Sequence, residues 1–87
     1  MNLREFRALE LTKLVRIKQE LMRKYPDRAG RIEEICDIIA GKLSTLRTYT
    51  LADFIFLLYQ ASKEFPEFSE LIPDEKVVAE LMRGGEE

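Results

Sequence analysis

Histidine is absent from this chain of 87 residues and cysteine is scarce, and each shortage excludes a class of chemistry. Without histidine, the chain cannot form a Ser-His or Cys-His catalytic pair or a histidine-ligated metal site. Cys36 is the single cysteine, so no internal disulfide can form. Cysteine usage therefore gives no support for an oxidising compartment.

Long apolar runs and glycine-rich loops are also lacking. The longest uninterrupted apolar stretch, residues 54–59, is far shorter than the roughly 20 residues that a membrane-spanning helix needs. Charged residues interrupt the first ten positions, unlike the apolar core of a signal peptide, so we expect a cytoplasmic protein. The adjacent pair Gly84 and Gly85 follows the last predicted helix, where it cannot form a phosphate-binding loop that opens a helix.

The remaining reactive residues predict no enzyme. Cys36 falls on the apolar face of a predicted helix, where a lone cysteine behaves as a small hydrophobic residue. Glu33, Glu34 and Asp37 could bind a hard cation, but neither a calcium-binding loop nor a second carboxylate cluster accompanies them. We interpret these acids as a solvated helix face. The sequence thus predicts no catalytic, cofactor-binding or metal-binding residue.

What is present is a pattern typical of helices. Apolar residues recur every three or four positions and no stretch predicts a strand, so we expect an all-α fold, a compact bundle of four helices. The predicted domain covers residues 1–84, with a disordered tail at 85–87. Pro26 and Pro66 end predicted helices, and Pro73 begins one. The helices are predicted at about 3–24, 27–43, 51–64 and 73–83, with a short helical turn at 66–71.

The predicted helix at 51–64 has apolar side chains in nearly every direction around its axis. A helix that is apolar all round is usually a buried one. We therefore expect this helix to be central, with the other three around it. The residues that indicate this are Leu51, Phe54, Ile55, Phe56, Leu57, Leu58 and Tyr59.

Charge is sorted by position. Residues 1–31 hold nine basic and four acidic side chains, a net charge of +5, whereas residues 32–87 hold five basic and twelve acidic ones, a net charge of −7. Glu, Lys and Arg together number 26 against one Asn and two Gln, which leans towards a heat-adapted source, although helices in general favour these residues. The first helix, together with two arginines near the start of the second, forms a basic face that comprises Lys13, Arg16, Arg23, Lys24, Arg28 and Arg31.

Three uses of that basic face stay open: contact with solvent, contact with the protein's own acidic surface, or sequence-nonspecific binding of a nucleic-acid backbone. A recognition helix needs Arg, Lys, Asn or Gln side chains that reach base edges. Residues 51–60 are mostly apolar and the overall charge is −2, so nucleic acid is the less favoured partner.

The first helix carries two adjacent apolar stripes, more than contact with one neighbouring helix requires. The first contains Leu3, Phe6, Leu14, Ile17 and Leu21, and the second contains Leu11, Val15 and Met22. The second stripe could pack on another helix of the chain or on a partner chain. A two-fold axis would let it pack antiparallel on its own copy, with Glu5 or Glu10 near Arg23 or Lys24.

Phe65 and Phe68 lie in an irregular stretch between predicted helices, where aromatic rings either anchor a partner or cover the core. We expect a small non-enzymatic protein-interaction module that is a homodimer: an adaptor, an assembly subunit or an inhibitor. Its size suits a phage, viral or plasmid accessory protein. A sequence-nonspecific nucleic-acid binder that uses the basic face is the alternative.

Overall fold

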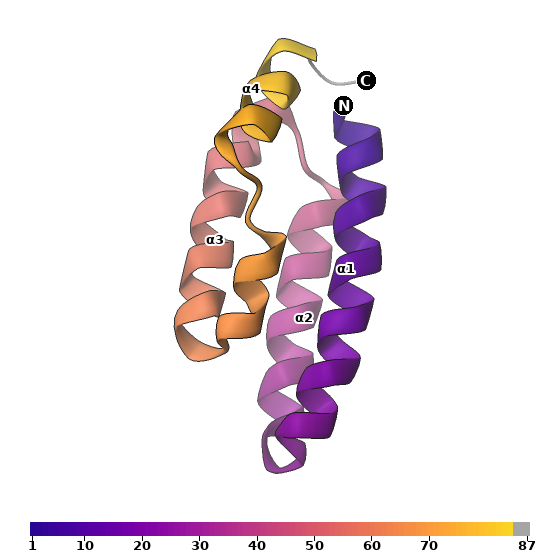
Figure 1. Ribbon diagram of the computed structural model, residues 1–87, viewed down its shortest axis with the longest axis vertical. Helices are drawn as coiled ribbons and strands as arrows, with labels where there is room; N and C mark the ends of the chain where they lie inside the picture. The colour runs from indigo at the N-terminus through magenta and orange to yellow at the C-terminus, as the bar shows by residue number, and fades with distance from the viewer. Residues whose placement is uncertain (85–87) are drawn as a thin grey trace.

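The computed structural model describes residues 1–84, which form four α-helices joined by short 3₁₀ helices (Figure 1). No strand occurs in this part of the chain, so the all-α prediction is confirmed. The predicted tail at 85–87 lies outside the described residues. The elements are α1 (Leu3–Lys24), η1 (Pro26–Arg28), α2 (Ala29–Ser44), η2 (Thr48–Thr50), α3 (Leu51–Glu64), η3 (Pro66–Leu71) and α4 (Glu75–Gly84).

Local chemistry explains where these helices begin. At the start of α1, the backbone N–H of Glu5 donates to Asn2 Oδ1 over 2.9 Å, and the backbone N–H of Asn2 donates to Glu5 Oε1 over 3.0 Å. This reciprocal pair is a capping box. At α4, the Val77 amide donates to Asp74 Oδ1 over 2.9 Å. The second helix begins at Ala29 rather than near Asp27, because Pro26–Arg28 forms a separate turn.

The helices pack as a ring of four elements around one core. α1 and α2 form an antiparallel hairpin, α3 lies along α2, and η3 returns between α3 and α1 (Figure 1). Phe6 and Phe54 meet edge to face with ring centroids 6.4 Å apart, which joins α1 to α3 through the core. Phe65 and Phe68 make a similar contact at 6.1 Å.

The prediction that the helix at 51–64 is central and buried is wrong. α3 buries Leu51, Phe54, Leu58 and Ala61 on one side only. Phe56 is 64% exposed and Tyr59 is 53% exposed on the other side. η3 packs between α3 and α1, on the buried side of α3. Within residues 1–84, no element covers the side of α3 that carries Phe56 and Tyr59.

α4 lies across the end of the bundle at which the chain begins (Figure 1). Leu81 is the α4 residue that is fully buried, and Val77 and Val78 are half-buried. The amino group of Met1 lies 3.9 Å from a Glu80 carboxylate oxygen. Among the described residues, no helix combines the length and the apolar character that crossing a membrane requires.

Candidate protein-interaction surface

The outward side of the α1–α2 hairpin exposes apolar side chains. Leu11 is 49% exposed and Val15 is 52% exposed, whereas Met22 is half-buried against the core. We call this side the hairpin face and define it by outward residues at helical spacing. It consists of Ala8, Leu11, Val15, Lys18 and Met22 of α1 and of Gly30, Glu34, Asp37, Gly41 and Ser44 of α2.

A shallow depression of about 260 Å³ lies between the two helices at one end of this face. The Arg7 guanidinium lies beside it and donates to the Leu46 carbonyl over 3.1 Å. Further along the hairpin, Lys18 Nζ lies 3.4 Å from a Glu33 carboxylate oxygen. These contacts hold α1 and α2 in register beneath an open apolar surface. The depression is lined by Arg7, Ala8, Leu11, Ala40, Leu43 and Ser44.

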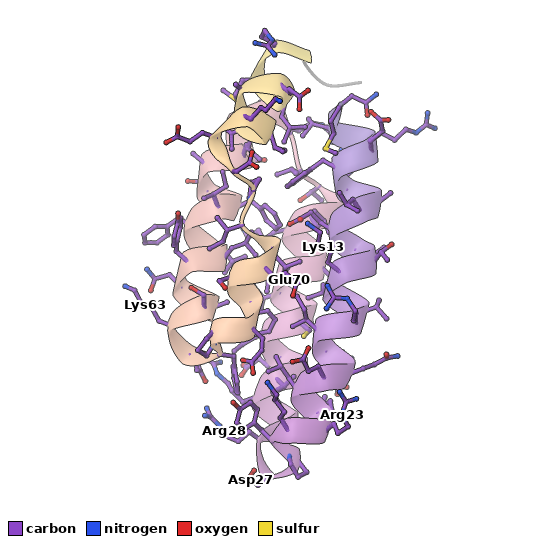
Figure 2. The ribbon with its side chains drawn as sticks, viewed as in Figure 1. Lys13, Arg23, Asp27, Arg28, Lys63 and Glu70 are labelled. Carbon is purple, nitrogen blue, oxygen red and sulfur yellow. The ribbon has the colours of Figure 1, made fainter. Side chains whose placement is uncertain are left out.

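Two basic residues of α1 outside the hairpin face contact acids of η3. Lys24 Nζ lies 3.0 Å from a Glu67 oxygen, and Arg16 donates to Glu70. The hydrogen bond from Arg16 lowers the pKa of the Glu70 carboxyl below its ordinary value. Figure 2 shows Lys13 of α1 and Glu70 of η3 near the contact between these two elements. This part of the basic face therefore holds η3 in place.

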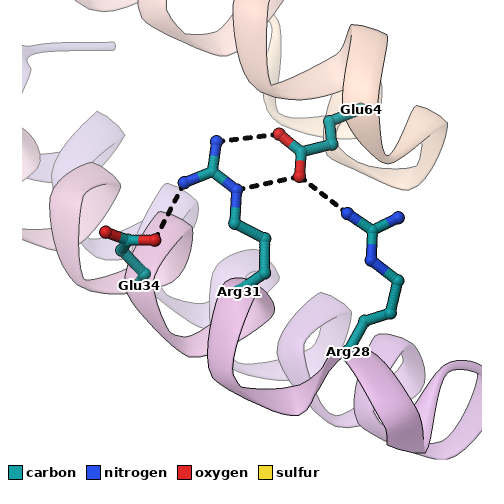
Figure 3. Close-up of polar contacts among 4 residues, drawn as sticks. All are labelled: Arg28, Arg31, Glu34 and Glu64. Atoms are coloured by element: carbon teal, nitrogen blue, oxygen red, sulfur yellow. Dashed lines mark hydrogen bonds and ion pairs between the residues drawn. The ribbon is translucent and has the colours of Figure 1, made fainter.

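Arg28 and Arg31 converge on Glu64 at the end of α3 (Figure 3). Arg31 makes two hydrogen bonds of 2.8 Å to the two Glu64 oxygens, and Arg28 adds one of 2.9 Å. Arg31 Nη1 also donates a hydrogen bond of 2.9 Å to Glu34 Oε1. The hydrogen bond to Glu64 raises the pKa of the Arg31 guanidinium, and the hydrogen bond from Arg31 lowers the pKa of Glu64. Arg28 also lies over the Phe65 ring, 4.7 Å from its centroid.

The structure thus places most of the basic face against the protein's own acids. Lys13 lies 3.8 Å from a Glu10 oxygen, and Arg23 is the one predicted residue of this face with no ion-pair partner within residues 1–84. A nucleic-acid backbone would have to compete with these internal ion pairs. The geometry therefore does not favour nucleic-acid binding by this face.

Of the two roles that the sequence leaves open for Phe65 and Phe68, the structure shows packing in the core rather than an exposed anchor for a partner. Both rings are buried in the core, Phe65 against Tyr25 and Phe68 against Phe65. The compact turn of η3 after Pro66 directs these side chains inward rather than to solvent.

A second exposed surface was missed by the sequence analysis. Tyr49, Phe56, Tyr59 and Met82 are exposed, and we call them the aromatic surface. A depression of about 250 Å³ between the start of α3 and α4 adjoins Tyr49 and Met82. The signal for this surface was present, since Asp53, Gln60 and Lys63 share the outward side of α3. Polar side chains at that spacing indicate that this side meets solvent.

Glu10 is the one charged residue buried in the core of the described chain, with 2% of its surface exposed. Its Oε1 accepts no hydrogen bond from the described residues. Burial raises the pKa of the Glu10 carboxyl from 4.5 to about 7, although Lys13 opposes part of that effect. The carboxyl borders a small cavity that Ile72, Pro73 and Val77 cover.

Within residues 1–84, no group of three or more Asp, Glu or Cys side chains is arranged to hold a metal ion. Cys36 is buried, and burial raises the pKa of its thiol. Comparison of the chain with models of protein families, with curated proteins and with solved structures gives no match.

Proposed function

We propose that this protein is a non-enzymatic interaction module that self-associates as a homodimer through the hairpin face. The observation that carries this proposal is the half-exposure of Leu11 and Val15, although Leu14 and Ile17 on the same helix are buried. Removing the exposed part of each side chain from water contributes roughly 1 kcal/mol. An exposed apolar stripe on a 22-residue helix is the kind of surface that a second helix covers.

The aromatic surface supports a role as an adaptor or assembly subunit. Tyrosine and phenylalanine are enriched at protein interfaces, because they contribute large contact areas at a small entropic cost. α3 lies at the opposite edge of the bundle from α1 (Figure 1). A dimer joined at the hairpin face would therefore leave the aromatic surface of each copy open to a different protein.

Sedimentation equilibrium over a range from low to high micromolar concentration tests the proposal. We expect the wild type to form dimers and Val15→Glu to remain monomeric, because a carboxylate at the centre of the stripe would be desolvated. Phe56→Glu is the matched control, since Phe56 is similarly exposed but lies on the aromatic surface. Circular dichroism should show unchanged helicity in both variants.

Each contrary result has a distinct meaning. A wild type that is monomeric at high micromolar concentration ends the proposal. Dimers that survive Val15→Glu but dissociate in Phe56→Glu place self-association on the aromatic surface, which also overturns it. Loss of helicity in Val15→Glu identifies Val15 as part of the core rather than of an interface.

A further inference from the structure

The two helices of the hairpin face differ in the sign of their charge. On α1, the hairpin face carries one charged residue, the base Lys18. On α2, the hairpin face carries two acids, Glu34 and Asp37. The basic helix of one copy therefore complements the acidic helix of another, whereas two copies of α1 would oppose like charges.

The two helices also differ in the size of their outward side chains. α1 presents Leu11, Val15 and Met22, whereas α2 presents Gly30, Gly41 and Ser44. In the described part of the chain, a Cβ added at Gly30 or Gly41 would meet no heavy atom within 4 Å. Packing within one chain thus gives no reason for glycine at either position, although glycine in a helix costs roughly 0.5–1 kcal/mol relative to alanine.

The spacing of these residues defines a register. Leu11 and Met22 are separated by three helical turns, about 16 Å, and so are Gly30 and Gly41. The contact of Lys18 with Glu33 and the depression shared by Leu11 and Ala40 fix the antiparallel alignment of α1 and α2. Leu11 is therefore level with Gly41, and Met22 is level with Gly30.

We propose that two copies pair face to face around a two-fold axis parallel to the helices, so that each α1 packs on the α2 of the partner. This arrangement rests on the proposed self-association and makes it specific. Rotation about an axis parallel to the helices leaves the position of each residue along the length of the bundle unchanged. Leu11 then meets Gly41 of the partner subunit, and Met22 meets Gly30 of the partner subunit. Lys18, which contacts Glu33 of its own chain, also lies opposite Glu34 of the partner subunit.

This pairing replaces the antiparallel contact of α1 with its own copy that the sequence suggested. That contact needed acids and bases of α1 on the rim of the interface. Glu10 is buried in the core, and Lys24 lies on the side of α1 that contacts Glu67 of η3, so neither residue is on the hairpin face.

The size of the face is compatible with a reversible dimer. α1 is about 33 Å long and the second extent of the molecule is 19 Å, so the projected face is on the order of 600 Å². A standard interface buries roughly 800 Å² on each partner. We therefore expect micromolar affinity that weakens with added salt, because the charge pairs lie at the rim.

Cysteine cross-linking tests the arrangement. Gln19→Cys and Glu33→Cys, each in a chain of distinguishable mass, are mixed and oxidised. We expect a disulfide between the two different chains in preference to either homodimeric product, because residues 19 and 33 are level on facing helices. The unmodified chain is the control, since its buried Cys36 should give no cross-link.

A second variant probes the close approach at glycine. Gly41→Leu should weaken dimerisation at least tenfold, because the added side chain fills the space that Leu11 of the partner subunit would take. Lys63→Leu, which adds similar apolar surface on α3, should leave dimerisation unchanged. Dimers that tolerate Gly41→Leu and form the 19–19 cross-link would overturn the arrangement while leaving the homodimer intact. A monomeric wild type would instead remove the proposed function itself.

Discussion

Replacing Glu10 with glutamine is expected to stabilise the protein at alkaline pH and to change little at acidic pH. Glu10 is buried, and burial raises its pKa from 4.5 to about 7. The folded chain therefore holds this proton more tightly than the unfolded chain does. The resulting stabilisation is complete below about pH 4.5 and is lost as the pH rises through about 7.

The size of the effect follows from the same two pKa values. A change from 4.5 to about 7 corresponds to about 3 kcal/mol between the protonated and ionised forms. This is a large part of the roughly 5–15 kcal/mol that stabilises a typical domain. Lys13 Nζ lies 3.8 Å from a Glu10 carboxylate oxygen, and Asp74 and Met1 line the same cavity as Glu10. Glutamine keeps the shape of the side chain but cannot ionise.

Urea denaturation at low micromolar concentration, at several values from about pH 5 to about pH 8.5, measures the effect. The free energy of unfolding of the wild type should fall across this range, whereas that of Glu10→Gln should stay nearly level. Asp37→Asn neutralises an exposed acid on α2 and should follow the wild-type profile. Parallel profiles for the wild type and Glu10→Gln would refute the argument that burial of an ionisable Glu10 destabilises the fold.

Other variants test the packing and the ion pairs. Phe68→Ala should lower the free energy of unfolding by about 3–5 kcal/mol in urea melts, because its ring is buried, whereas Phe56→Ala should cost less than about 1 kcal/mol. An effect of Phe56→Ala as large as that of Phe68→Ala would contradict the position of α3. Glu64→Gln should remove stability that is present above about pH 4.5 and lost below it, since Arg31 lowers the pKa of Glu64; high salt should reduce the difference from wild type. Leu81→Ala should speed amide hydrogen exchange in α4 and leave α1 and α2 protected, because Leu81 is the fully buried residue of α4; slower unfolding of α4 than of α1 would contradict this.

Helix positions were readable from the sequence because their determinants are local. The predicted bounds 3–24 and 51–64 coincide with α1 and α3, since Pro26 and Pro66 end helices near the residues that precede them. The second apolar stripe of α1 was also readable, and Leu11 and Val15 of that stripe are exposed in the structure. Whether that stripe meets a partner is a prediction that the dimer experiments test.

Burial was decided only by tertiary structure, because it depends on which distant segment covers a side chain. Phe56 and Phe68 are the same residue type, yet one is exposed on α3 and the other is enclosed when η3 folds back against α1. The burial of Glu10 likewise depends on the chain beyond η3, where Ile72 and Val77 cover its cavity. Ion pairs such as that between Arg31 and Glu64 join residues separated by 33 positions, a distance over which helical periodicity carries no information.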